Sequence, residues 1–123
     1  MKKILIVEDD KLLASALKIM LEGSGFEAIV ALEGYYAIQR AHKDRPDLII
    51  TDLGLPAGDG FRIIKTLKES ADLMSIPAII ITGKNDQETI AKIETLGVAA
   101  YFIKPFDHKA LLNAVKKATG GGT

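Results

Sequence analysis

The chain has 123 residues, a length that fits one domain with a sizeable core. Its 16 basic and 16 acidic residues balance, which argues against a general electrostatic attraction to nucleic acid or anionic lipid. It has no cysteine, so disulfides, thiolate metal sites and thiol redox chemistry are excluded. The apolar run at residues 4–7 is too short for a signal peptide or a membrane span, and we expect a soluble cytoplasmic protein.

Five apolar runs alternate with five helical patterns along the chain. The third run, residues 48–51, is nearly continuous and β-branched, which is typical of a strand buried on both faces of a parallel sheet. The alternation predicts an open α/β sheet that is covered on both faces, with right-handed crossovers. The predicted strands are residues 3–7, 26–32, 48–51, 77–81 and 98–103, and the predicted helices cover residues 13–21, 35–42, 61–67, 90–96 and 111–118.

Polar residues mark where several predicted helices begin. Asp10 and Asp107 are the expected N-caps of the first and the last helix. Asn85, with Glu88 three positions later, forms a capping-box pattern that predicts the start of the fourth helix, and Gly97 is expected to end it.

Polar residues also follow the predicted strands at their carboxyl ends. Glu8 and Asp9 follow the first strand, Asp52 the third, Thr82 the fourth and Lys104 the fifth. Because the carboxyl ends of parallel strands meet at one edge, these side chains are expected to share a pocket. Clustered carboxylates repel one another, and a hard divalent cation relieves that repulsion; Mg²⁺ is the usual candidate. An aspartate beside Mg²⁺ and a lysine can attack phosphorus, and Asp52 is the first candidate.

Taken singly, each of these residues has a simpler interpretation. Asp9 could cap a helix, Asp52 could be a turn residue, Thr82 could be a strand terminus or a local cap, and Lys104 could be a surface lysine. Complementary groups at four strand ends favour a shared site.

With these motifs the sequence resembles the receiver domain of bacterial two-component response regulators, over essentially its whole length. The matching segments are Ile4 to Asp10, Pro46 to Pro56 with Asp59-Gly60, Ile79 to Gly83, and Tyr101 to Phe106. The resemblance implies a flavodoxin-like, doubly wound, five-stranded sheet of order 2-1-3-4-5, in which Asp9 and Asp52 flank the point where the winding reverses. It also implies a receiver domain at residues 1–119, followed by a flexible tail or linker at 120–123.

The resemblance implies a phosphorelay role for the acidic residues. Asp52 would accept a phosphoryl group from a phosphohistidine on a sensor histidine kinase or a histidine phosphotransfer protein. Mg²⁺ would be held directly by Asp9, by Asp52 and by the backbone carbonyl of Gly54, whereas Glu8 would act through a water. Such a domain is a phosphoacceptor that catalyses only its own phosphorylation and dephosphorylation.

The other matching residues would form a switch. Lys104 would pair with Asp52 at rest and with a phosphoryl oxygen afterwards. Thr82 would turn its hydroxyl onto the phosphoryl group, and Tyr101 would swing into the vacated space. The face of the fourth helix, fifth strand and fifth helix would then change for an unknown downstream target, with no direct binding of nucleic acid or membrane. In many relatives the bond between Lys104 and Pro105 is cis.

A few positions depart from the family pattern. Glu8 stands where many relatives have an aspartate, and the charge is kept. Gly54 and Lys84 occupy positions that in the family tune how fast water removes the phosphoryl group. Tyr35-Tyr36 has no clear counterpart, and we expect a surface or partner-contact role for it.

Three other functions compete with the phosphoacceptor switch. An aspartate-nucleophile phosphohydrolase resembling the haloacid dehalogenase group would need a second aspartate two positions after Asp52, where this chain has Gly54. A receiver-like module that docks or dimerises without phosphorylation is the main alternative. A flavin protein is disfavoured, because the loop after the first strand lacks a Ser/Thr/Gly run for the flavin phosphate.

Overall fold

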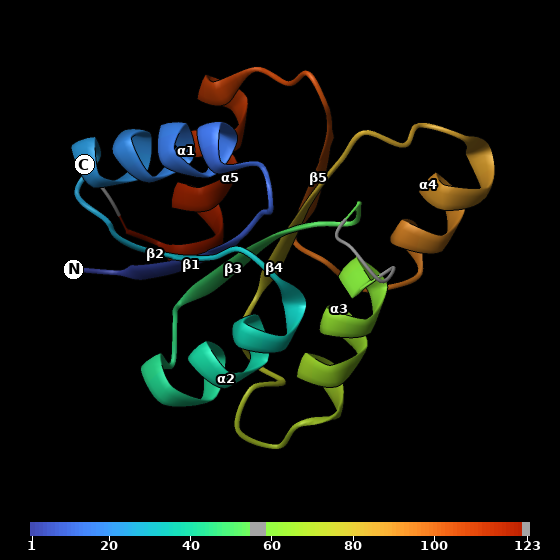
Figure 1. The fold of residues 1–123 in the computed structure, drawn as a ribbon, viewed down its shortest axis with the longest axis horizontal. Coiled ribbons are helices and arrows are strands. Elements are labelled where there is room, and N and C mark those ends of the chain that lie inside the picture. Colours follow the sequence, from blue (N-terminus) through green and yellow to red (C-terminus); the bar gives the residue numbers. More distant parts are fainter. Residues whose placement is uncertain (55–58, 122–123) are drawn as a thin grey trace.

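Five parallel strands form a sheet in the order β2-β1-β3-β4-β5 in the computed structural model, which describes residues 1–54 and 59–121 (Figure 1). This result confirms the predicted fold class and strand order. The strands are β1 (Lys3–Val7), β2 (Glu27–Ala31), β3 (Leu48–Asp52), β4 (Ala78–Thr82) and β5 (Ala100–Ile103). The helices are α1 (Lys11–Gly23), α2 (Gly34–Asp44), α3 (Asp59–Glu69), α4 (Gln87–Glu94) and α5 (His108–Thr119).

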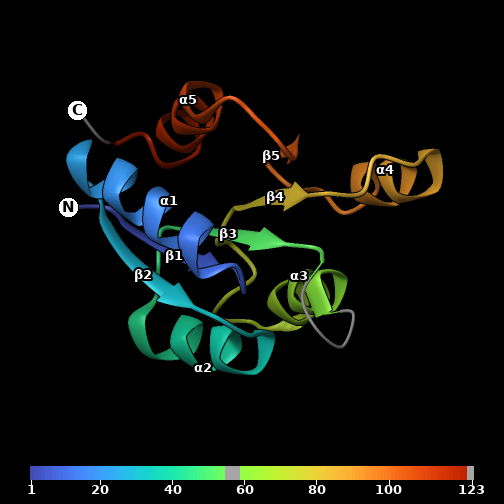
Figure 2. The same cartoon turned by 45° about the horizontal axis from the view of Figure 1, so that its top comes forward.

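Two apolar cores lie on opposite faces of the sheet. Side chains alternate along a strand, so Leu5 and Val7 belong to one core and Ile4 and Ile6 to the other. The core with Leu5 is closed by α2 and α3 and contains Ile93 of α4, whereas α1 and α5 close the core with Ile4 (Figure 2). The central strands β1, β3 and β4 are therefore buried on both faces, as expected for continuous apolar runs, whereas the edge strands β2 and β5 are only partly buried.

Acidic N-caps begin the helices, with one correction to the expected positions. Asp10 and Asp107 cap α1 and α5, which confirms those predictions. The capping box predicted at Asn85 is wrong, because α4 is capped by Asp86. The Asp86 carboxylate accepts hydrogen bonds from both the backbone N–H and the hydroxyl of Thr89, at 3.0 and 2.8 Å. Asp86, with Thr89 three positions later, thus caps the N-terminus of α4.

The chain leaves β1 and β3 toward opposite faces of the sheet. β1 leads into α1 on one face, and β3 leads toward α3 on the other, while the two strands pair side by side from Ile4 with Leu48 to Val7 with Thr51. In open parallel sheets, ligands bind at the carboxyl ends of two neighbouring strands whose connections diverge in this way. The predicted motif residues Leu55 and Pro56 lie outside the described residues.

The first and last described residues lie together at the opposite edge of the sheet. A Cβ added at Gly121 would meet the Lys2 side chain at 2.6 Å. Gly120 caps α5 in a left-handed conformation, with φ 63°, and the remainder of the predicted tail, residues 122–123, lies outside the described residues. Within the described parts of the chain, no helix has both the length and the apolar character needed to cross a membrane.

Candidate phosphoacceptor site

Three carboxylates meet at the carboxyl ends of β1 and β3. One carboxylate oxygen from each of Glu8, Asp9 and Asp52 lies within 4.8 Å of the others. Glu8 is 0% exposed and Asp52 is 4% exposed, whereas Asp9 is open to solvent. The cluster therefore combines two sequestered acids with one that an incoming cation can reach directly.

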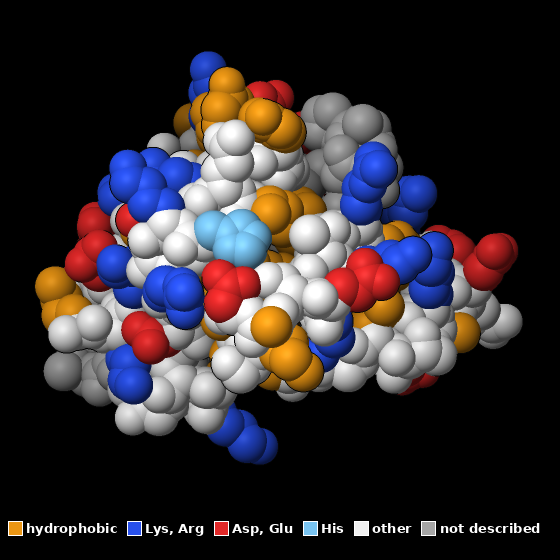
Figure 3. All heavy atoms as spheres, turned by 90° about the horizontal axis from the view of Figure 1, so that it is seen from below, with side chains coloured by type: hydrophobic (Ala, Val, Ile, Leu, Met, Phe, Trp, Pro, Cys, Tyr) orange, Lys and Arg blue, Asp and Glu red, His pale blue; other side chains and the backbone are white. Residues whose placement is uncertain are grey.

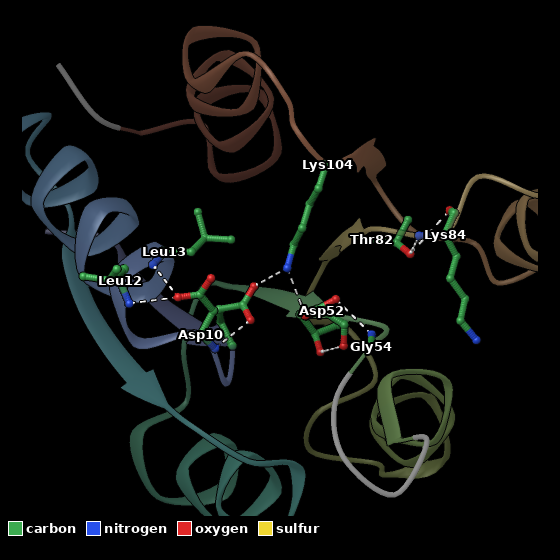
Figure 4. A network of polar contacts seen from close by, with 10 residues as sticks. Asp10, Leu12, Leu13, Asp52, Gly54, Thr82, Lys84 and Lys104 are labelled. Atoms are coloured by element: carbon green, nitrogen blue, oxygen red, sulfur yellow. Dashed lines mark hydrogen bonds and ion pairs between the residues drawn. The ribbon is translucent and has the colours of Figure 1, made fainter.

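Lys104 reaches from the end of β5 into this cluster (Figure 4). Its Nζ donates to Glu8 Oε1 at 2.8 Å and to Asp52 Oδ2 at 3.0 Å. Burial lowers the Lys104 pKa, but the hydrogen bonds to Glu8 and Asp52 outweigh it, so the pKa is raised and the ammonium is secured. Burial raises the pKa of Glu8, and the hydrogen bond from Lys104 offsets only part of that rise.

Backbone N–H groups hold the remaining oxygens of the two buried acids. Gly54 N donates to Asp52 Oδ1 at 2.9 Å, and Asp10 N donates to Glu8 Oε2 at 3.0 Å. The Asp10 carboxylate itself turns away, because it caps α1 through the N–H groups of Leu12 and Leu13 (Figure 4). Asp10 thus serves the helix and lies outside the acidic cluster.

The Thr82 hydroxyl is buried at the end of β4, on the other side of Asp52 from Glu8. Its Oγ1 accepts a hydrogen bond from Lys84 N at 2.9 Å (Figure 4). Tyr101 on β5 is half-buried and packs against the core that contains Leu5. The bond between Lys104 and Pro105 is cis, as the resemblance implied.

The donor set fits a hard divalent cation. All three cluster residues offer carboxylate oxygens, the ligand type that Mg²⁺ prefers. Both oxygens of Glu8 and both oxygens of Asp52 already accept a hydrogen bond from the protein, so hydrogen bonding does not distinguish these two acids as metal ligands. Asp9 is exposed, so its carboxylate is available to a metal.

Two features of the site were not predicted from the sequence. The pair between Glu8 and Lys104 joins residues 96 positions apart, and no local pattern signals it. Gly60 is the second feature, because a Cβ there would lie 2.4 Å from Leu53 Cα and 2.7 Å from the Asp52 carbonyl oxygen. The glycine in the segment Asp59-Gly60 was the available signal, since close approach of two backbones requires a residue without a side chain.

Comparison with known proteins identifies the family. The family model described as response regulator receiver domain matches residues 4–116. The chain belongs to the response regulator receiver family. This receiver domain is 34% identical to the polar-differentiation response regulator DivK of Brucella anthropi over 122 residues, which cover 97% of each chain. It is a domain of two-component signalling, a phosphoacceptor module rather than a classical enzyme, and its family implies a histidine kinase as partner.

The chain is also similar to part of a longer regulator and to a solved receiver domain. The receiver domain is 34% identical to the probable transcriptional regulator ycf29 of Porphyra purpurea, with 92% of this chain and 54% of that protein covered. The chain thus spans about half the length of that relative. Among solved structures, the signal receiver domain of a signal transduction histidine kinase from Syntrophus aciditrophicus is 33% identical with a TM-score of 0.90, covering 98% and 92% of the two chains.

Proposed function

We propose that Asp52 accepts a phosphoryl group from a phosphohistidine on a sensor histidine kinase or a histidine phosphotransfer protein, in a reaction that depends on Mg²⁺. The observation that carries the proposal is the acidic cluster of Glu8, Asp9 and Asp52 with the Lys104 ammonium in contact with two of its members. In this reaction a phosphorus–oxygen bond forms to the Asp52 carboxylate. The phosphorus–nitrogen bond of the donor breaks, and the imidazole keeps the electron pair.

Each residue has a separate task in this reaction. Asp9 and Asp52, with the backbone carbonyl of Gly54, would hold Mg²⁺, and Glu8 would act through a bound water. The metal, when bound, neutralises charge on the transferring phosphoryl oxygens. Lys104 donates to the Asp52 carboxylate at rest and would pair with a phosphoryl oxygen afterwards.

The switch would use the residues next to the acceptor. The Thr82 hydroxyl accepts from Lys84 N and donates to the Lys84 carbonyl at 3.5 Å, and its proton would turn from that carbonyl to a phosphoryl group on Asp52. The movement of Thr82 would vacate space for Tyr101, and the surface of α4, β5 and α5 would change for a downstream partner. We assign this receiver role to residues 1–119, treat residues 120–123 as a tail or linker, and place the domain in the cytoplasm with histidine kinases.

Phosphoryl transfer is tested by intact-mass measurement after incubation with Mg²⁺ and acetyl phosphate or a phosphorylated kinase. The wild-type chain is expected to gain one phosphoryl group that is lost on treatment with hydroxylamine. Asp52→Asn keeps the shape of the side chain but should gain none. Asp10→Asn is the matched control, because it also removes one acid while asparagine still caps α1, and it should be labelled like the wild type.

Equal labelling of Asp52→Asn and the wild type would refute the assignment of Asp52. A chain that releases more than one equivalent of phosphate from a small phosphate ester would instead support the phosphohydrolase alternative. That outcome is not expected, because the position two residues after Asp52 is Gly54, which has no acid to protonate a leaving group.

A further inference from the structure

A groove separates α3 from α4, away from the acidic site. Its volume is about 550 Å³, and its apolar side chains come from both walls. Phe61 and Leu96 are half-buried and Ile64 is buried, so the groove has an apolar floor between two helices. No function described above uses this groove.

The rim of the groove is strongly basic. Of the charged residues that line it, four are basic and one, Glu69, is acidic, in a chain whose net charge is zero. Lys65 and Lys68 stand on the α3 side and Lys92 on the α4 side. Seen from below, the surface of the molecule carries Lys and Arg, Asp and Glu and hydrophobic side chains side by side (Figure 3). A ligand for this groove therefore needs negative charge along both borders of an apolar stripe.

Two of the rim lysines, Lys68 and Lys92, are held by contacts within the protein. Lys92 Nζ lies 4.1 Å from the centroid of the Phe61 ring, and Lys68 Nζ donates to the Gly97 carbonyl at 3.2 Å. Both contacts join the α3 side of the groove to the α4 side. Charges held in this way lose less side-chain entropy on binding than freely rotating lysines would.

The fourth helix has little packing of its own. α4 is eight residues long, and Ile93 is its one buried residue. In Figures 1 and 2 it lies at the margin of the molecule, beyond β4 and β5. On the side toward α3, Lys92 and Thr95 are exposed and Leu96 is half-buried, so a partner can reach this side.

We propose that the groove between α3 and α4 is a docking site for an acidic amphipathic helix of a partner protein. The side chains of Phe61, Ile64 and Lys68 recur at three or four positions along α3, so apolar floor and basic rim run parallel to the helix axis. A helix with apolar residues at positions i, i+3 or i+4 and i+7 and acids on both flanks matches this pattern.

A second copy of this chain is a poorer occupant. α3 itself carries Lys65 and Lys68, and α5 carries Lys109, Lys116 and Lys117, so these helices would bring like charge to the rim. Charge complementarity therefore disfavours a second copy docked through α3 or α5 and favours an acidic partner protein. The inference does not depend on phosphoryl transfer, since the groove is described in the unmodified chain.

The test uses a designed helical peptide with leucines at positions i, i+3 or i+4 and i+7 and glutamates on both borders. It is titrated into the isotope-labelled full chain without any phosphoryl donor. We expect saturable amide shifts that concentrate at Phe61, Lys92 and Leu96 and affinity that weakens as salt rises. A peptide with lysines in place of the glutamates should bind at least about tenfold more weakly.

Two double variants distinguish binding in the groove from a general effect of net charge. Lys65→Glu with Lys68→Glu should weaken binding about tenfold, whereas the matched double reversal Lys109→Glu with Lys117→Glu on α5 should leave it unchanged. Circular dichroism of both variants checks the fold. No saturable shift up to about 1 mM peptide, equal binding of the lysine peptide, or shifts centred outside α3 and α4 would each overturn the proposal. Self-association of the chain through this groove, detected by sedimentation, would overturn the choice of occupant.

Discussion

Lys104 sets the charge balance of the acidic site. When all groups are ionised, three carboxylates and one ammonium leave two uncompensated negative charges, which a divalent cation matches. Because Glu8 is fully buried, its ionised form depends on the Lys104 ammonium and on Asp10 N. Lys104 thus contacts two of the acids but neutralises only one of the three negative charges.

Asp72 provides a pH-dependent contact remote from this site. Its carboxylate accepts hydrogen bonds from the Ser70 hydroxyl at 2.5 Å and pairs with His42 Nδ1 at 3.0 Å, which lowers its pKa from 3.8 to about 2. A carboxyl group with a lowered folded pKa stabilises the protein above its unfolded pKa and loses that effect as the pH falls toward the folded pKa.

We therefore expect Asp72→Asn to lower the thermal midpoint at about pH 5, and the difference from the wild type to shrink as the pH falls from about 3.8 through about 2. Thermal unfolding of both chains, followed by circular dichroism across this range at constant ionic strength, measures the difference. A difference that stays constant between pH 3.8 and pH 2 would contradict the assigned cause, because Asp72 titrates in that window.

The start of α3 packs closely against the end of β3 at Gly60, where a side chain would not fit. We expect Gly60→Ala to destabilise the chain by about 2 kcal/mol, because the new Cβ would overlap Leu53 Cα and the Asp52 carbonyl oxygen. Gly23→Ala is the matched control, since Gly23 ends α1 with nothing within 4 Å of an added Cβ. Its expected effect is a gain of about 0.5 to 1 kcal/mol. Urea unfolding measures both, and equal stability of the two variants would contradict the close approach.

Local sequence patterns predicted the elements well because the strands are continuous apolar runs that end in polar residues. Asp52, Thr82 and Lys104 could be placed at one edge because parallel topology brings all strand ends together. The cap of α4 was missed by one position, since Asn85 and Asp86 both fit a capping pattern and only the hydrogen bonds to Thr89 distinguish them. Tertiary contacts such as Glu8 with Lys104 have no local signature.

Metal binding is expected to stabilise the whole molecule. If Mg²⁺ binds only the folded chain with a Kd of about 1 mM, then about 10 mM Mg²⁺ raises the free energy of unfolding by about 1.4 kcal/mol. Urea unfolding with Mg²⁺ and with a chelator measures this difference.

The variants at neighbouring acids locate the metal. Asp9→Asn should lose most of the stabilisation by Mg²⁺, because it removes the exposed member of the cluster. Asp10→Asn should keep it, since the Asp10 carboxylate caps α1 instead. An equal response of Asp9→Asn and the wild type would contradict the proposed ligands.

The short distance between Lys2 and Gly121 has a practical consequence for handling this domain. Strands begin and α5 ends at the edge remote from the acids, so a fluorophore, surface tether or fused protein attached at either terminus projects away from the acceptor. Because the two ends lie close together, a short linker could join them, and new ends could be opened elsewhere in the chain. The linker of such a circularly permuted chain would not cover the edge that carries the acids.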